Sequence, residues 1–247
     1  MGLNRFKEVD QRGIVLASEI RPAGFLLRPD RAKCPTLSTH IVRVMAKKVT
    51  KKTRPISRET KIYNGSDLIK VEAEFLERIE AMLGKEIPFI PRDDNNQTFG
   101  FYAEDRHVMR LSLNDSGIDT LPETIGNLVE LKELYMNHDE VVSVPESMAS
   151  LKHMEILVLD HNKLTELPAW IGDFSNLLSL TASFNQIAEI PDSFTKLPVA
   201  RVKAFVIIQK PPPKMSMKIR TWLTDLRRMG GIVNVYGWQP ASSGGLA

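Results

Sequence analysis

The apolar positions of this chain follow a 23-residue period from Val108 to Leu197. An aliphatic residue followed by proline recurs at the same point of each period, at Leu121-Pro122, Val144-Pro145, Leu167-Pro168 and Ile190-Pro191. Ahead of each dipeptide lies an apolar–x–apolar segment typical of a short strand. A fixed period of roughly 20 to 50 residues is the sequence signature of stacked solenoids. The pattern therefore predicts four coils, each contributing one short strand to a parallel sheet.

The period changes after Leu197. Shortening it by one residue aligns Val199, Val202 and Ala204 with the strand positions of the earlier coils. This alignment places Ile207 where the third and fourth coils carry asparagine, and the three prolines at 211–213 end the pattern. We therefore expect a degenerate fifth coil.

Both flanks of the repeats offer caps, which a solenoid needs to cover its end coils. Upstream, Ser66 is a candidate N-cap for a helix over residues 67–83 that Gly84 ends. Residues 98–103 and 107–113 are expected to form a hairpin whose second strand is the first strand of the repeats. The predicted inward stripe of the helix comprises Leu68, Val71, Phe75, Ile79 and Met82.

Downstream, residues 216–229 have the period of an amphipathic helix that Gly230 and Gly231 end. Residues 232–236 follow as a final edge strand. The side chains predicted to point inward from the helix are Ile219, Trp222, Leu223, Leu226 and Met229. The expected domains are a basic arm at 1–62, an N-terminal cap at 63–107, the repeats at 108–207, and a C-terminal cap and tail at 208–247.

The repeated positions resemble the leucine-rich-repeat family, in the class with the pattern LxxLxLxxNxLxxLPxxIgxLxx that residues 154–176 show best. That class includes Ras-suppressor-like and scaffold proteins. The resemblance implies an α/β fold, namely a short curved solenoid with a parallel sheet on its concave face. It also implies that Asn162 and Asn185 satisfy backbone groups in the turns. Ser116 and Asp139 occupy the same position in the first two coils, so the ladder is expected to be weaker there.

Charge separates an arm from the rest of the chain. Residues 1–62 hold 15 Lys+Arg against 5 Asp+Glu, and residues 43–61 hold eight basic residues against Glu59 alone. This composition is typical of a flexible arm. The arm is either a solvated tail or the contact through which an RNA- or anionic-surface-associated protein holds its target. Met45, within the arm, is a candidate alternative start of translation.

Composition excludes several classes of function. The 247 residues are 43% hydrophobic and contain no apolar run of about 18 residues, which argues against a transmembrane span. The N-terminus lacks the apolar core of a secretory signal, so we expect a cytoplasmic protein. A single cysteine, Cys34, rules out an intrachain disulfide or a multi-cysteine zinc site. Motifs for nucleotide binding, zinc proteases and serine hydrolases are missing, so we expect neither an enzyme nor a cofactor.

Function is therefore expected on the concave sheet, where residues that flank the inward leucines point to solvent. Tyr135, Ile156 and Val158 would form an apolar and aromatic spot of the kind that anchors protein interfaces. We expect a monomer that binds a protein there, and the resemblance makes a small GTPase or another signalling protein a candidate partner. The predicted protein-binding residues are Arg110, Glu133, Tyr135, Asn137, His138, Ile156, Val158, Asp160, His161 and Phe184.

Two further questions stay open in the sequence. His138 and His161 are one period apart with Asp160 beside them, so two imidazoles and a carboxylate are also a candidate metal or catalytic site. Phe184 continues the same column and would more naturally stack on His161. Trp170 falls on the convex side, where it either packs against the core or marks a second contact surface.

Overall fold

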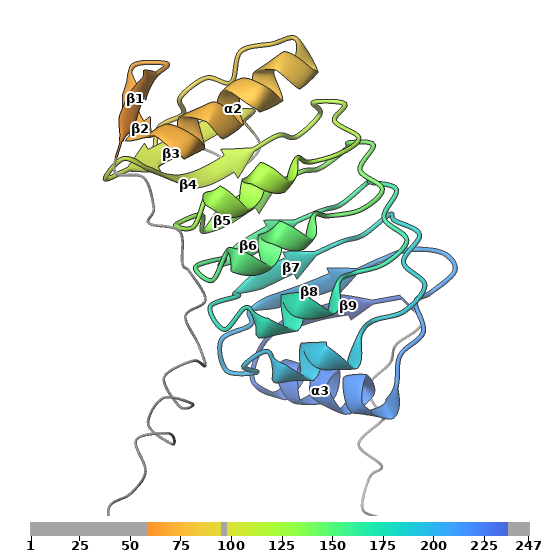
Figure 1. Cartoon of the computed structure of the whole chain (residues 1–247). Coiled ribbons are helices and arrows are strands. Elements are labelled where there is room, and N and C mark those ends of the chain that lie inside the picture. The colour runs from red at the N-terminus through yellow and green to blue at the C-terminus, as the bar shows by residue number, and fades with distance from the viewer. Residues whose placement is uncertain (1–58, 95–97, 237–247) are drawn as a thin grey trace, which may run out of the picture. The chain divides into compact units, whose positions relative to one another are not determined.

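A computed structural model describes residues 59–94 and 98–236 of the chain (Figure 1). None of the described helices is long and apolar enough to cross a membrane. In chain order, the elements are β1 (Thr60–Tyr63), β2 (Ser66–Ile69), α2 (Lys70–Leu83), β3 (Gly100–Glu104), β4 (His107–Ser112), η1 (Glu123–Asn127), β5 (Glu133–Tyr135), η2 (Glu146–Ser150), β6 (Ile156–Val158), η3 (Ala169–Asp173), β7 (Ser179–Thr181), η4 (Asp192–Lys196), β8 (Ala204–Ile207), α3 (Met217–Arg228) and β9 (Ile232–Val235).

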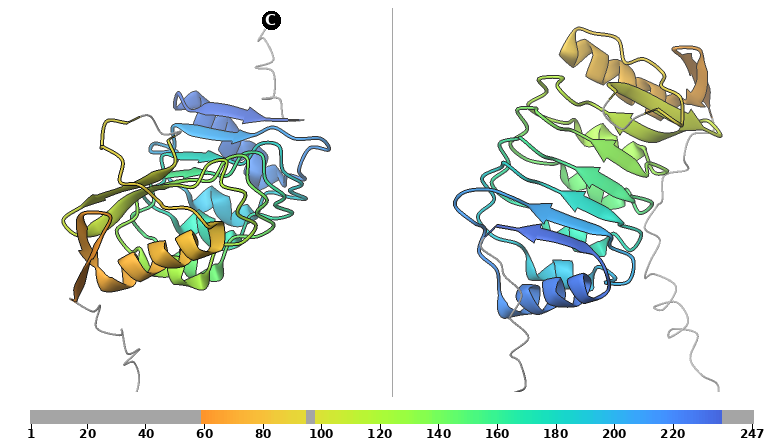
Figure 2. Two further views of the ribbon diagram at one scale, coloured as in Figure 1. Left: turned by 90° about the horizontal axis from the view of Figure 1, so that it is seen from above. Right: turned by 180° about the vertical axis from the view of Figure 1, so that it is seen from behind.

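A seven-stranded sheet forms one layer of the described part, in the order β3-β4-β5-β6-β7-β8-β9. Strands β4 to β9 run parallel, and β3 joins β4 as an antiparallel hairpin, as the sequence predicts. The short helices η1 to η4 and α3 form the opposite layer (Figure 2). The central residues of the strands meet in register and point into the core between the layers. They are Leu111, Leu134, Leu157, Leu180, Phe205 and Val233.

The convex layer begins at the repeated prolines. Pro122, Pro145, Pro168 and Pro191 precede η1 to η4, and each has a φ between −59° and −70°, which suits the first turn of a helix and cannot continue a strand ladder. Adjacent turns pack closely at Gly172, where an added Cβ would lie 2.2 Å from the Ser193 carbonyl oxygen. Each repeated proline thus marks the point where its coil enters the convex layer.

Two asparagines tie neighbouring coils together, as the resemblance implies. The Asn162 Oδ1 accepts a hydrogen bond from the Val141 N–H at 3.0 Å, and its Nδ2 donates to the Met136 carbonyl at 2.6 Å. Asn185 repeats both bonds one coil later, with Leu164 and Leu159. Both amides are buried, so these bonds satisfy backbone groups that water cannot reach.

The first rung of this ladder holds a carboxylate instead. The Asp139 Oδ1 accepts hydrogen bonds from the Ser116 and Gly117 backbone N–H groups at 2.9 and 2.8 Å. Its Oδ2 is buried and has no hydrogen-bond partner among the described residues, because a carboxylate lacks the N–H that asparagine would donate. The ladder is therefore weaker at its N-terminal end, as predicted.

The predicted alignment of the fifth coil is wrong. Leu180 pairs with Phe205, 25 residues later, so the coil is two residues longer than the period and not one shorter. Phe205 and Ile207 both point inward and are fully buried, whereas Ala204 lies on the concave face. The asparagine position falls to Gln209, whose Oε1 accepts from the Ile187 N–H at 3.0 Å. The longer glutamine side chain continues the ladder across the irregular coil.

The N-terminal cap differs from its prediction at the start of the helix. Residues 66–69 form β2 rather than the first helical turn, and α2 begins at Lys70 without a side-chain cap. The Asn64-Gly65 turn joins β1 to β2 as an antiparallel hairpin, with positive φ at both residues. Gly84 ends the helix in the left-handed conformation, as predicted, but Met82 is exposed rather than inward.

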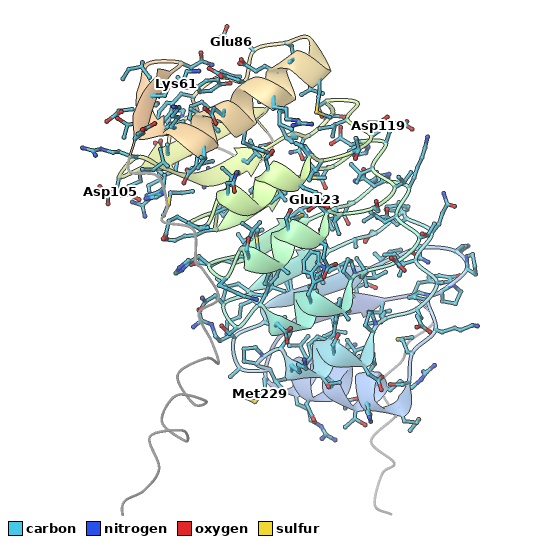
Figure 3. The ribbon with its side chains drawn as sticks, in the orientation of Figure 1. Lys61, Glu86, Asp105, Asp119, Glu123 and Met229 are labelled. Atoms are coloured by element: carbon cyan, nitrogen blue, oxygen red, sulfur yellow. The ribbon has the colours of Figure 1, made fainter. Side chains whose placement is uncertain are left out.

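The C-terminal cap follows its prediction except at one residue. The Ser216 Oγ accepts a hydrogen bond from the Ile219 N–H at 3.2 Å and caps α3, whose buried face holds Trp222, Leu223 and Leu226. Met229 was predicted to point inward, but it lies after the last helical turn and is exposed (Figure 3). The strand after the helix is the outer strand β9, as expected.

Most of the basic arm lies outside the described residues. Cys34, Met45 and residues 43–58 belong to that part of the chain, so the structure says nothing about them. The last residues assigned to the arm are ordered, because β1 begins at Thr60 and the Lys61 Nζ lies 2.5 Å from the Glu77 carboxylate on α2. The folded part therefore begins before residue 63.

Candidate functional site

Two rows of side chains form the concave face, because every second residue of each strand points away from the core. The pairing register assigns their members. The first row consists of Arg110, Glu133, Ile156, Ser179, Ala204 and Ile232. The second row consists of Ser112, Tyr135, Val158, Thr181, Val206 and Asn234.

At the N-terminal end of these rows, on β4 and β5, the side chains form a polar cluster that bonds within itself. The Arg110 Nε donates to the Glu133 carboxylate at 2.6 Å, and the Tyr135 hydroxyl donates to the same oxygen at 3.1 Å. Only 9% of Arg110 and 4% of Tyr135 is exposed, so the prediction that both present themselves to solvent is wrong. Burial, followed by the nearby Glu133 charge, raises the pKa of Tyr135, which therefore stays a neutral donor. The sequence could not show this burial, because it arises from contacts between coils.

The remaining part of both rows forms a neutral surface, which we name the concave patch. Its residues are Ile156, Val158, Ser179, Thr181, Ala204, Val206, Ile232 and Asn234, all partly or fully exposed. None of them carries a charge, in contrast to the ion pair between Arg110 and Glu133 beside them. Ile156 and Val158 were predicted from the sequence, whereas the members on β8 and β9 were not. Residues 204–208 are all apolar, so no alternation of apolar and polar positions marks the outward residues of β8 in the sequence.

Asn137 and Asp160 lie along the C-terminal ends of the strands and were predicted to be available for binding. Their side chains are instead used within the solenoid. The Asp160 carboxylate accepts from the Thr181 hydroxyl at 2.8 Å and from the Ser183 N–H at 2.5 Å. The Asn137 Oδ1 accepts from the Asp160 N–H at 3.3 Å. These residues position the edge of the concave patch, and Asp160 also orients Thr181 within it.

A stack of three exposed rings lines that edge, and we name it the ring column. The centroids of His138 and His161 are 4.1 Å apart, and those of His161 and Phe184 are 4.2 Å apart, with planes within 18° of parallel. Each residue has a φ of 55° to 57°, a left-handed conformation that costs energy for a side chain other than glycine. The predicted stacking of Phe184 on His161 is confirmed.

The geometry of the ring column does not favour a metal site. Two imidazoles stacked face to face direct their nitrogen lone pairs side by side rather than toward a common point. Among the described residues, no three histidine, cysteine, aspartate or glutamate side chains converge to hold a metal ion. Asp160, the third candidate ligand, already accepts two hydrogen bonds from its own sheet. The two histidines therefore present ring edges and polar nitrogens to solvent.

Trp170 on the convex side packs against the fold. Its Nε1 donates to the Glu146 carboxylate of the preceding coil at 2.9 Å, and its ring lies 5.6 Å from that of Phe174. Only 9% of the residue is exposed. Of the two predicted roles, packing against the core is the one that the structure bears out.

No protein-family model matches the chain, and no curated protein matches it by sequence. Solved structures with partial similarity include a leucine-rich-repeat protein of Leptospira interrogans, with 23% identity over 42% of this chain and 26% of that one, at a TM-score of 0.39. The leucine-rich-repeat ectodomain of the receptor kinase SOBIR1 from Arabidopsis thaliana shows 21% identity over 57% of this chain and 80% of that one, at a TM-score of 0.44. The BIR3–SERK2 complex of the same plant matches with 18% identity over 56% and 79%, also at 0.44. The chain thus spans about a quarter of the Leptospira protein.

The fold is evident from the chain's own geometry. Four coils repeat every 23 residues, and their strands pair in parallel. Buried Asn162 and Asn185 join the third and fourth coils to the coils before them. Each coil alone is too short to bury its leucines, and stacking gives all of them one continuous core. The folded part of this chain is a leucine-rich-repeat solenoid.

Proposed function

We propose that this protein is a non-enzymatic interaction module that binds a protein partner on the concave patch. The observation that carries the proposal is the contrast within one sheet. On β4 and β5, Arg110, Glu133 and Tyr135 satisfy one another, whereas the strands from β6 to β9 present uncharged side chains to solvent. Apolar groups interrupted by a few hydroxyls and rimmed by polar residues are typical of the centre of a protein interface.

The rigid frame supports this function. The patch lies on strands whose turns are fixed by buried amide bonds, such as those of Asn162 and Asn185, so its side chains are in place before a partner arrives. Little conformational entropy is then lost by the module on binding. The ring column adds exposed aromatic edges along one side. The sequence resemblance makes a small GTPase or another signalling protein the first partner class to test.

The test is to place a charge on the patch without disturbing the fold. Val158→Arg and Ala204→Arg put a long cation on the concave surface, while Thr165→Arg adds the same cation to an exposed residue outside the patch. Proteins captured from lysate by the full chain would be compared among these variants at high salt. Partners lost by both patch variants and kept by Thr165→Arg support the proposal. Equal capture by all of them would refute it.

Mapping the contact distinguishes the site from the rest of the surface. Cross-linking of the captured partner, read by mass spectrometry, should reach Lys203, which directly precedes Ala204 of the patch. Cross-links confined to α2, or to residues 43–58, would assign binding to the N-terminal cap or to the basic arm instead.

A further inference from the structure

The outer edge of β9 is open for pairing. The Ile232 N–H donates to the Lys203 carbonyl at 2.8 Å, and the Tyr236 N–H donates to the Ile207 carbonyl at 3.1 Å, so these groups face β8. Alternation along the strand then directs the N–H groups of Val233 and Val235 away from the sheet. No described residue pairs with that side of β9. Four consecutive residues thus offer an unused edge of hydrogen-bonding groups.

The opposite edge of the same sheet is covered. The Phe101 N–H of β3 donates to the Pro88 carbonyl at 2.9 Å, and the Phe101 carbonyl accepts from the Ile90 N–H at 2.8 Å. This segment blocks the outer side of β3. The two ends of the solenoid are therefore not equivalent, and only the C-terminal end leaves its last described strand unpaired.

β9 also lacks the features that usually protect an edge strand. Natural edges carry lysine, proline or a bulge that discourages another strand from pairing. The residues from Ile232 to Val235 include none of these, and three of the four are apolar and β-branched, which favours an extended conformation. Ile232 is 65% exposed, and Met229 and Tyr236 beside the strand are exposed as well. This composition suits a strand that is covered by something else.

The charge around β9 indicates what kind of segment would pair with its outer edge. Residues 198–236 hold eight Lys+Arg against Asp225 alone, whereas residues 59–197 hold 11 Lys+Arg against 25 Asp+Glu. Asp225 is paired with Arg228 at 3.4 Å. The Lys203 carbonyl accepts the Ile232 N–H while its Nζ donates to the Ala200 carbonyl at 3.4 Å, and the Lys210 Nζ lies 5.5 Å from the Tyr236 ring. β9 itself is therefore neutral, and Lys203 and Lys210 lie before and after the neighbouring strand β8.

We propose that the outer edge of β9 binds an extended, acidic-flanked segment of a partner protein as an added strand. The backbone groups of Val233 and Val235 would pair with the segment, and Lys203 and Lys210 would meet carboxylates on either side of its apolar centre. A second copy of this chain is the weaker occupant, because a two-fold axis at β9 would bring two basic ends together. The proposal uses the backbone edge of β9, whereas the concave patch uses the side chains of Ile232 and Asn234 on the same strand.

The probe for the test is a peptide with a five-residue core of alternating valine and threonine and two glutamates at each end. Titrated into the full chain and followed by NMR, it should shift the amide signals of residues 232–236 and slow hydrogen exchange at Val233 and Val235. The same peptide with lysine in place of glutamate should bind at least about tenfold more weakly, as expected for the loss of two or more charge contacts.

Two pairs of variants separate backbone pairing from other causes. Val233→Pro removes an outward N–H without breaking the bonds to β8 and should weaken peptide binding about tenfold, while Val233→Ala keeps the N–H and should bind nearly as the wild type does. Lys210→Glu should weaken binding, while Lys152→Glu, the same charge change on a distant exposed lysine, should not. Thermal unfolding of each variant checks that the fold is kept.

Four results would overturn the proposal. Slow exchange at Val233 and Val235 in the free monomer would mean that the chain's own residues already cover the edge. A dimer that Val233→Pro dissociates would assign the edge to a second copy. Equal binding of the acidic and basic peptides would show that charge does not select the segment. Equal binding by Val233→Pro and Val233→Ala would show that the backbone edge does not bind it.

Discussion

Glu72 on α2 holds the N-terminal cap to the first repeat strand through His107 on β4. One carboxylate oxygen of Glu72 lies 2.7 Å from the His107 Nδ1, and the other accepts the Val108 N–H at 2.7 Å. Only 1% of Glu72 is exposed. Burial raises the pKa of Glu72, while both hydrogen bonds oppose that rise. A single side chain thus joins an element outside the repeats to the edge of the solenoid.

Removing this contact should weaken the fold. Glu72→Ala leaves the buried Val108 N–H without an acceptor and opens a space under the helix, so we expect the free energy of unfolding to fall by about 3 kcal/mol. Urea unfolding followed by circular dichroism measures it. Glu74→Ala, on the exposed side of the same helix, should change stability by no more than about 0.5 kcal/mol. Similar losses in the two variants would contradict the role of Glu72.

Completing the ladder at its first rung should stabilise the protein. Asp139→Asn replaces an oxygen that has no described partner with an N–H that can donate to a backbone carbonyl, as the Asn162 Nδ2 donates to Met136. We expect a gain of about 1 kcal/mol at neutral pH, measured by urea unfolding. The reverse control is Asn162→Asp, added to Asp139→Asn. The double variant should lose the gain, because it has the same unpartnered oxygen one coil later.

The same residue predicts a pH dependence. Burial raises the pKa of Asp139, so the folded state favours the protonated acid. The stability that protonation provides is fully present below the ordinary aspartate pKa of about 3.9 and is lost as the pH rises through the raised pKa of the folded state. The advantage of Asp139→Asn over the wild type should therefore grow with pH across that interval and then level off. An advantage that is constant with pH would contradict the buried acid.

The ring column allows backbone strain to be separated from stacking. Phe184 has a φ of 56°, which glycine adopts freely and alanine does not. Both Phe184→Gly and Phe184→Ala remove the ring from His161, so they lose the same stacking. We expect the glycine variant to be more stable than the alanine variant by about 1 kcal/mol. Calorimetric or urea unfolding decides the order, and a more stable alanine variant would mean that the local backbone relaxes.

Close packing between convex turns gives a sharper test of the fold. Gly172→Ala would bring a Cβ to 2.2 Å from the Ser193 carbonyl, and backbone rather than a flexible side chain would have to move. We expect a loss of about 3 kcal/mol or more. Ala169→Ser alters an exposed residue of the same turn and should be nearly neutral. A tolerated alanine at 172 would show that η3 and η4 can move apart at little cost.

The period in the sequence predicted the coils well because each strand repeats the same local environment. It failed at the fifth coil, where residues added between Leu197 and Phe205 shift the frame, and only the register of β7 with β8 reveals the shift. The start of α2 was missed for a different reason. Ser66 is a good N-cap, but Asn64-Gly65 is a strong hairpin turn, and pairing of β1 with β2 prevailed.

The candidate site was predicted only in part, for reasons that lie between coils. Ile156 and Val158 lie on the concave face as expected and are partly exposed, because they flank the buried Leu157 on its strand. Tyr135 is covered because Glu133 accepts its hydroxyl and Arg110 pairs with the same carboxylate, a contact across 23 residues that local pattern does not encode. Ile232 could be assigned to the concave face only once the pairing of β8 with β9 was known.

The unmatched rung at Asp139 also sets where the solenoid would part under load. Each coil contacts only the coils beside it, so tension along the axis is borne in series by successive joints. The joint between the first two coils has backbone acceptors without the amide donor that Asn162 and Asn185 supply further along. A pulled chain should therefore open first at this joint. α2, which Glu72 fastens to β4, would come away with the first coil as one piece and leave the concave patch on β6 to β9 intact.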